Sequence, residues 1–264
     1  PSWVPPHVAE RLLEVVRRLL KPQGIAFVSY NTYPGWYQME GLRNMMLYRV
    51  RGTTDDTERI EQARQLLRFV AHAHPADDSP FGVWVNGFLQ YIDVGDDFNS
   101  DERDAYLLHD QLEKDNHPVF FHQFIASATR HGLQYVCDAE IESDFPQGFP
   151  EGTLDYLRQM VHSAEEMQQY MDFARNRMFR RTLLTHAETP LSRVLRPERL
   201  ASMRFASPML PAEDETVLRG SEAVTFRNHA GLSLTTDHPL SKAAIQCLTV
   251  QWPRQFTLDE LVDC

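Results

Sequence analysis

The stretch that decides the fold is Leu19-Leu20-Lys21-Pro22-Gln23-Gly24-Ile25-Ala26-Phe27-Val28-Ser29-Tyr30-Asn31-Thr32-Tyr33-Pro34-Gly35-Trp36. Pro22 and Gly24 end a preceding helix, and the segment from Ile25 to Tyr30 is nearly continuous in apolar residues. Such a run is typical of a parallel strand that is covered on both faces. A parallel strand needs a neighbour, yet only one helix precedes this strand. We therefore expect one step of a doubly wound sheet, in a piece cut from a larger enzyme.

The composition is that of a globular protein and argues against several kinds of partner. The 264 residues are 42% hydrophobic, and no apolar run approaches the ~20 residues that span a bilayer. A formal charge of −11 argues against nucleic acid as the main partner. Cys137, Cys247 and Cys264 are far apart and odd in number, so neither a disulfide framework nor a cysteine metal site is expected. Because there is no signal-peptide pattern and no metal spacing among the histidines, we expect a cytoplasmic protein without a metal or a membrane partner.

Helical periodicity dominates residues 38–116. The helices predicted there begin near Met39, at Asp55 or Asp56, at Ser79-Pro80 and at Ser100. Pro118 then opens another helix, Gly132 ends it, and residues 133–136 have a strand pattern. We expect the chain to return there to the sheet that it left earlier. Residues 38–116 are then an insertion over the carboxyl edge of that sheet.

The second half of the chain combines helices with a small β region. Residues 153–186 have a helical pattern, and a new helix is predicted after Ser163 because Ser163 and Glu166 form a capping box. The elements predicted next are a short helix over 196–203, hairpin arms over 223–226 and 232–234, a helix from Pro239, and a helix after a capping box of Thr257 and Glu260.

Charge is unevenly distributed along the chain. Residues 51–115 hold 15 Asp and Glu against 6 Lys and Arg, whereas residues 175–204 hold eight Arg against two Glu. Solvated helix faces are the commoner explanation of such runs. An arginine-rich helix is predicted to contain Arg175, Arg177, Arg180 and Arg181. It either binds an acidic partner or, as we favour, braces carboxylates of the insertion.

Several segments resemble one enzyme family. Residues 20–28 resemble the LKPGG turn and fifth strand of class I S-adenosylmethionine-dependent methyltransferases, with Gln23 in place of one glycine. Residues 29–36 are similar to bacterial methyltransferases that carry a methyltransferase regulatory domain directly after this strand. Further similar segments are 106–113, 116–121, 132–135 and 170–180. The resemblance covers at least residues 1–186, and some members of the family are bacterial protein-lysine methyltransferases.

The resemblance implies a helix-rich fold of mixed α/β and α+β class. A partial Rossmann-like methyltransferase sheet with a helical insertion is followed by a helical and small β region and a truncated winged-helix-like end. The implied parts are the end of the methyltransferase domain (1–37), the helical insertion or regulatory domain (38–116), the return to the sheet (117–145), a second helical plus β region (146–236) and the start of a winged-helix-like module (237–264). The implied cofactor of the full-length protein is S-adenosylmethionine. The family's glycine loop has no counterpart here, so the cofactor-binding residues are expected outside this chain and no cofactor is expected bound to it.

Candidate site residues follow from the rule that open α/β sheets bind ligands at the carboxyl ends of their strands. Tyr30 and Asn31 leave the strand at that end and are candidate catalytic residues, together with His109 as a base. The candidate substrate-binding residues are Trp3, Tyr33, Trp36, Tyr106, Asp110 and His122. The aromatic ones can hold an alkylammonium or a sulfonium by cation–π contact. The alternative is that Tyr33 and Trp36 pack the insertion onto the sheet, which we favour for Trp36. For His109 the alternative is a structural contact of the helix, which we also favour.

These patterns favour a transferase. We interpret the chain as the C-terminal and regulatory portion of an S-adenosylmethionine-dependent methyltransferase whose acceptor is a protein or another large nucleophile. The chain alone is expected to be inactive. The alternative interpretation is a non-enzymatic regulatory or protein-interaction module, whose winged-helix-like end contacts another protein or, less favoured, DNA.

Overall fold

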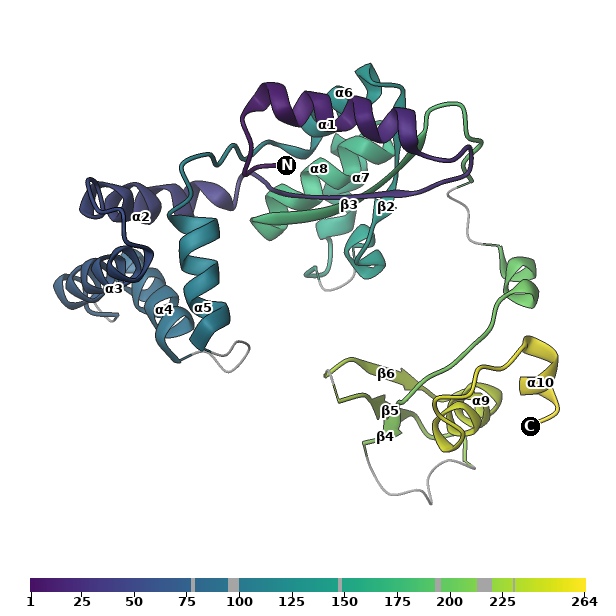
Figure 1. Ribbon diagram of the computed structural model, residues 1–264. Helices are drawn as coiled ribbons and strands as arrows, with labels where there is room; N and C mark the ends of the chain where they lie inside the picture. Colours follow the sequence, from purple (N-terminus) through teal and green to yellow (C-terminus); the bar gives the residue numbers. More distant parts are fainter. Residues whose placement is uncertain (77–78, 95–99, 147–148, 193–195, 213–219, 230) are drawn as a thin grey trace. The chain divides into compact units, whose positions relative to one another are not determined.

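The chain folds into two compact units, Pro1–Pro190 and Leu191–Cys264, which are described separately (Figure 1). The computed structural model describes residues 1–264 except 77–78, 95–99, 147–148, 193–195, 213–219 and 230. Within the described residues, no helix is both long and apolar enough to cross a membrane. The boundary between the units falls inside the region 146–236 that the sequence groups together.

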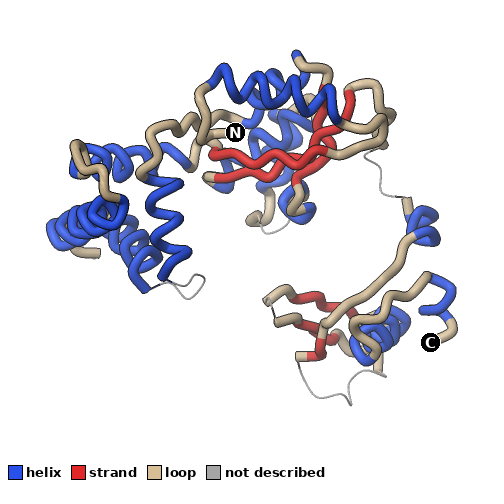
Figure 2. Tube along the Cα trace, viewed as in Figure 1, coloured by secondary structure: helices blue, strands red, loops and turns tan. Residues whose placement is uncertain are grey.

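A three-stranded sheet organises the described part of the first unit (Figure 2). Its strands are, in spatial order, β1 (Ala26–Asn31), β3 (Phe179–His186) and β2 (Leu133–Asp138), and the central β3 is antiparallel to both neighbours. Helices α1 (Pro6–Leu19) and α6 (Phe121–Arg130) pack against it through a core that contains Leu13, Tyr30, Phe124, Leu133 and Leu184. Because β1 and β2 both run opposite to β3, their carboxyl ends lie at the same edge of the sheet.

The structure corrects two expectations for β1. Its hydrogen-bonded neighbour in the described chain is antiparallel rather than parallel, and Tyr30 pairs in register with Arg180. One face of the strand is also open, because the Ile25 side chain just before it is 60% exposed and Phe27 is 57% exposed. Side chains alternate along a strand, so Val28 and Tyr30 point toward the helices and Phe27 points away. In the described chain, β1 is therefore an edge strand that is covered on one face.

Phe179–His186 forms strand β3, so the prediction of helix through residue 186 is wrong. Helices α7 (Thr153–Met160) and α8 (Ala164–Arg175) form as predicted, and the Ser163 hydroxyl caps α8 by accepting a backbone hydrogen bond at 3.0 Å. The helix ends at Asn176, which has a left-handed φ of 49° that is typical of a helix C-terminus. The chain then extends between β1 and β2 and gains ladder hydrogen bonds on both sides. This tertiary pairing overrides the local helical pattern.

The arginines around β3 brace carboxylates, but not those of the insertion as predicted. Arg180 lies in β3 and is fully buried. Its guanidinium forms a bidentate pair with Asp172 of α8, with both N–O distances 2.8 Å. Arg177 donates to Asp138 of β2 at 3.0 Å. The guanidinium of Arg180 also lies 4.0 Å from the ring centre of Phe121 in α6, so this network joins the sheet to two helices.

Among the described residues of the insertion, the helices follow the sequence prediction. They are α2 (Trp36–Arg49), α3 (Asp56–Ala73), α4 (Pro80–Val94) and α5 (Ser100–Tyr106), and α5 continues as a short π-helix over Leu107–Gln111. Asp55 caps α3 by accepting a hydrogen bond from the Glu58 backbone N–H at 2.8 Å, which confirms the predicted start. The core of this helical lobe includes Met46, Leu67, Val85, Ile92 and Leu107.

The second unit contains a small antiparallel sheet followed by helices. Its described elements are a 3-10 helix η3 (Pro197–Ser202), strands β4 (Leu210–Pro211), β5 (Val224–Arg227) and β6 (Ser233–Thr236), and helices α9 (Pro239–Val250) and α10 (Leu258–Val262). The hairpin and the capping box of Thr257 and Glu260 agree with the sequence prediction. A disulfide joins Cys247 and Cys264, against the expectation from cysteine number and spacing, because α10 folds back on α9. The winged-helix-like character of residues 237–264 stays a prediction.

Candidate functional site

Two other segments of the first unit meet β1 at its carboxyl end. The Asn31 backbone N–H donates to the Ser2 hydroxyl at 2.9 Å, and the His117 N–H donates to the Ser2 carbonyl at 2.8 Å. The Val119 N–H donates to the Asn31 carbonyl at 3.2 Å. The first residues of the chain, the end of β1 and the segment after the helical insertion are therefore held together at one edge of the sheet.

Buried polar atoms at this edge have no hydrogen-bond partner in the described part of the chain. Asn31 Nδ2 donates to Asn116 Oδ1 at 3.1 Å, which leaves Asn31 Oδ1 and Asn116 Nδ2 unpaired. The Trp3 Nε1 is also buried and unpaired, and the Trp3 ring centre lies 6.3 Å from that of Phe179, the register partner of Asn31. A buried polar group without a partner costs about 1–3 kcal/mol. An acceptor, two donors and an aromatic surface in one place therefore indicate a binding site.

The loop after β1 carries aromatic residues that pack against the helical lobe. Tyr33 stacks on Tyr37 with ring centres 4.0 Å apart, and its hydroxyl donates to Glu40. Burial and the Glu40 carboxylate raise the pKa of Tyr33. Trp36 is 4% exposed and belongs to the apolar core of the helical lobe. Tyr33 therefore keeps a partly exposed surface, whereas Trp36 has the position of a packing residue.

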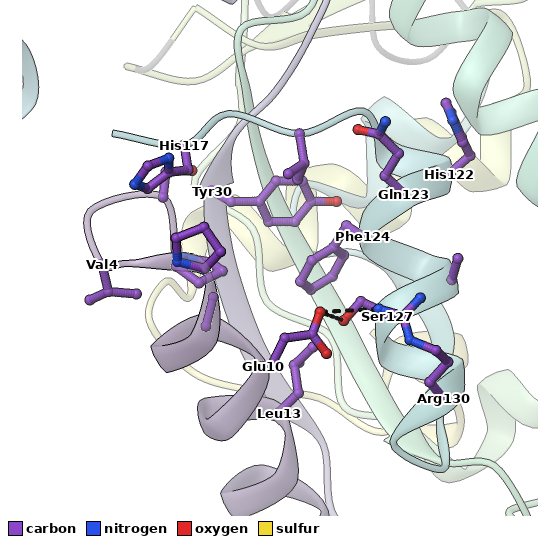
Figure 3. Close-up of a pocket in the computed structure, with 16 residues that line it drawn as sticks. Val4, Glu10, Leu13, Tyr30, His117, His122, Gln123, Phe124, Ser127 and Arg130 are labelled. Atoms are coloured by element: carbon purple, nitrogen blue, oxygen red, sulfur yellow. Dashed lines mark hydrogen bonds and ion pairs between the residues drawn. The ribbon is translucent and has the colours of Figure 1, made fainter. Parts of the chain in front are cut away.

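A cavity of about 470 Å³ lies between α1, β1 and α6 (Figure 3). The Tyr30 and Phe124 rings that line it stack with their centres 4.1 Å apart. Across the cavity, Glu10 of α1 accepts a hydrogen bond from the Ser127 hydroxyl at 2.7 Å and pairs with Arg130 at 3.1 Å. The cavity therefore combines an apolar wall from the sheet with an ion pair that links the two helices.

Tyr30 is a neutral hydrogen-bonding group in the core. Its side chain is fully buried, and its hydroxyl shares a hydrogen bond with the Thr182 hydroxyl at 3.1 Å. Burial is the main reason that the pKa of Tyr30 is raised. The phenol therefore stays protonated near neutral pH and is suited to positioning rather than to acting as a base.

Apart from Tyr33 and Trp36, the structure places the candidates in three groups. The described lining of the cavity that contains Tyr30 also contains His122 but neither His109 nor Tyr106. His109 is exposed on the π-helix, and Tyr106 contacts Tyr91 edge-to-face with ring centres 5.7 Å apart. Trp3 and Asn31 are thus brought together at the sheet edge, Tyr30 and His122 line one cavity, and His109, Tyr106 and Asp110 belong to the helical lobe.

Sequence reasoning missed Ser2 and Asn116, which both contact Asn31. Asn116 is separated from Asn31 by 85 positions, and no local pattern indicates that contact. The available signal was positional, since Ser2 precedes Trp3 and Asn116 begins the family-like segment 116–121.

Asp110 is expected to make the protein less stable as the pH rises from about 4 to about 6. Burial raises the pKa of Asp110 from 3.8 to about 6, and His109 only partly opposes this effect. Between these values the folded state binds a proton that the unfolded chain has released, so stability is present at the lower pH and is lost as the pH rises. Urea titrations at several pH values in this range give the free energy of unfolding as a function of pH. This free energy should fall less steeply with rising pH in Asp110→Asn than in the parent protein. The matched control is Glu151→Gln, which removes an exposed carboxylate; equal slopes in the two variants would contradict this assignment.

Comparisons with known proteins define the class of the chain. Residues 103–186 match the family described as a predicted methyltransferase regulatory domain. The chain is therefore related to S-adenosylmethionine-dependent methyltransferases that carry this domain, as the sequence motifs predict.

Individual relatives make the similarity more specific. PKMT2 from Rickettsia typhi, a protein lysine methyltransferase, has a similar structure with a TM-score of 0.79 and 29% identity, covering 99% of this chain and 49% of PKMT2. A second PKMT2 structure that is equally similar is a complex with AdoHcy. The uncharacterised protein RP789 of Rickettsia prowazekii is 31% identical over 249 residues, which are 92% of this chain and 44% of that protein. The chain therefore spans about half the length of the relatives it matches.

Proposed function

We propose that this chain forms the acceptor-binding and regulatory portion of an S-adenosylmethionine-dependent methyltransferase whose acceptor is an amine on a protein. The observation that carries the proposal is the group of unpartnered polar atoms of Trp3, Asn31 and Asn116 at the carboxyl end of β1. The similarity to PKMT2 supports a protein acceptor. The open edge of β1 supports the inference that this sheet continues as a Rossmann-like sheet in a longer protein.

The residues present at this edge suit an amine nucleophile. S-adenosylmethionine supplies the electrophilic methyl group when it is bound in enzymes of this class. Asn31 Oδ1 is a free acceptor for an amine N–H, and the Trp3 and Phe179 rings offer faces to an alkylammonium. Burial at the site lowers the pKa of a lysine, which favours the neutral amine that attacks. Holding this amine in line with the methyl group and its leaving sulfur can lower the activation barrier by up to ~7–11 kcal/mol. Positioning is therefore the main task of these residues.

Replacing Asn31 by alanine in the full-length protein is expected to reduce methyl transfer to a protein acceptor by about 10- to 100-fold. The neutral amine gains positive charge as it attacks the methyl group, and a hydrogen bond to a charged group contributes about 1.5–3 kcal/mol. Transfer of radiolabelled methyl groups measures the effect. The matched control is Asn44→Ala, which changes an exposed asparagine of α2 and should leave the rate unchanged. If Asn31→Ala and Asn44→Ala are equally active and equally stable, the chain has no part in acceptor binding and the module interpretation gains.

A further inference from the structure

A groove on the helical lobe, separate from the sheet edge, is lined with aromatic rings. It has a volume of about 480 Å³, and Trp84, Phe88 and Tyr91 of α4 and Tyr106 of α5 line it. Gly87 lies in the same lining, and a Cβ atom at that position would meet nothing within 4 Å. The groove is therefore open directly above the glycine.

The rings of the groove differ in orientation. The Trp84 and Phe88 ring planes are 14° apart with centres separated by 6.2 Å. The Tyr91 and Tyr106 planes are 87° apart with centres separated by 5.7 Å. The described lining is completed by aliphatic and thioether side chains and contains no charged residue. Such a surface attracts a ligand through dispersion and through the negative faces of its rings, and not through an ion pair.

The lobe that carries the groove is strongly acidic. Residues 51–115, which include α3, α4 and α5, hold 15 Asp and Glu against 6 Lys and Arg. Asp110, one helical turn after Tyr106, is partly buried and interacts electrostatically with it. A negative lobe draws cationic ligands toward the groove and disfavours anionic ones.

We propose that this groove binds the trimethylammonium group of a methylated lysine within a basic peptide. An unmethylated ammonium is a compact, strongly hydrated ion, and the described lining offers it no carboxylate to replace that water. A trimethylammonium has no N–H, is weakly hydrated and is held by aromatic faces. The basic residues that flank it in the peptide complement the acidic lobe.

One residue of the groove lining is hydrogen-bonded to the segment that carries the candidate acceptor site. Met178 lines the groove, and its carbonyl accepts a hydrogen bond at 2.8 Å from the backbone N–H of Thr32, the residue after Asn31. A methylated lysine side chain that has left the candidate acceptor site can therefore be held by the groove. The binding itself goes beyond the proposed methyl transfer and does not require it.

Calorimetric titrations of the full chain with three peptides of the same basic sequence test the chemistry of the ligand. One peptide carries trimethyllysine, one carries its neutral tert-butyl isostere, and one carries unmodified lysine. The trimethyllysine peptide should bind about 10-fold more tightly than either of the others, as expected of an aromatic site that recognises a cation. Equal affinity for the trimethyllysine peptide and its neutral isostere, or no binding of any peptide, would overturn the proposal.

Matched glycine variants test the location of the site. Gly87→Leu adds an apolar side chain to the lining at a position where the Cβ atom meets nothing within 4 Å, and should weaken binding of the trimethyllysine peptide at least about 10-fold. Gly41→Leu adds the same side chain to an exposed position of α2 that is also free of neighbours within 4 Å, and should leave the affinity unchanged. Unaltered binding in Gly87→Leu would place the peptide elsewhere and refute the proposal. Because these titrations involve no methyl transfer, their outcome is independent of that of the Asn31 experiment.

Discussion

Replacing Arg180 by methionine is expected to lower the free energy of unfolding of the first unit by about 3–5 kcal/mol, which is enough to unfold a marginally stable protein. The Arg180 side chain is fully buried and pairs with Asp172 at 2.8 Å and with Asp138 at 3.5 Å. Both carboxylates are also buried, at 1% and 0% exposure. Methionine matches the stem of arginine but removes the bidentate partner of Asp172. Arg177 then remains as the cation beside the two carboxylates, 3.0 Å from Asp138 and 3.8 Å from Asp172. The cost therefore comes from two buried carboxylates that share one remaining cation, and not from an empty volume.

The pH dependence of this variant separates charge from packing. Burial raises the pKa of Asp172, and the cation of Arg180 opposes that effect. Loss of this cation raises the pKa of Asp172 further. The stability lost in the variant is therefore smaller at low pH, where the carboxyl group is protonated, and grows as the pH rises. Guanidinium titrations at several pH values measure this change. A penalty that is the same in acid and in alkali would show that packing and not charge is responsible.

Arg181→Met is the matched control for Arg180→Met. Arg181 is the next residue of β3, and its ion pair with Glu140 is about half exposed, at 46% and 47% for the two side chains. Exposed ion pairs contribute about 0–1 kcal/mol, so the free energy of unfolding should hardly change. If Arg181→Met destabilises the protein as much as Arg180→Met, the buried network does not have the role assigned to it.

Gly35→Ala is expected to destabilise the first unit by about 1–3 kcal/mol and to distort the carboxyl edge of β1. A Cβ at Gly35 would lie 2.2 Å from the Asn176 carbonyl oxygen and 2.7 Å from the Arg177 carbonyl carbon. Both atoms are backbone, so neither can rotate away. The Gly35 N–H also donates to the Arg177 carbonyl at 3.0 Å, and this bond holds the loop after β1 against the segment before β3. Thermal unfolding measures the loss of stability.

The matched control for Gly35→Ala is Gly41→Ala in the following helix. A Cβ at Gly41 meets nothing within 4 Å, and alanine is a better helix former than glycine by about 0.8–1.0 kcal/mol. Gly41→Ala should therefore raise the midpoint of thermal unfolding, whereas Gly35→Ala should lower it. Two shifts of the same sign would mean that the close approach at Gly35 is not maintained in solution.

Much of the helical architecture could be predicted from local signals. The start of α3 at Asp55 and that of α8 at Ser163 follow from capping residues whose hydrogen bonds form within three positions. The amphipathic periodicity of residues 38–116 predicts the helices of the lobe for the same reason. Segment 20–36 also led directly to the methyltransferase class, which the comparisons support.

The candidate site could be predicted only in part. Trp3 and Asn31 were predicted because both were expected at the carboxyl edge of one sheet. Asn116 was not found, because its contact with Asn31 depends on where the chain returns after the insertion. Tyr30 and Trp36 were predicted from their sequence neighbourhood, yet burial of their side chains is a property of packing that no local pattern records.

The sequence by itself determined the starts of α3 and α8, the position of β1 and the family motifs, because these depend on neighbours a few residues apart. Only the tertiary structure decided that Phe179–His186 is a strand, that Arg180 and Asp172 face each other in the core, and that Cys247 meets Cys264. The physical reason is that ladder hydrogen bonds, buried ion pairs and disulfides take their energy from partners that the fold brings together. A segment with helical periodicity becomes a strand when two open edges lie on either side of it.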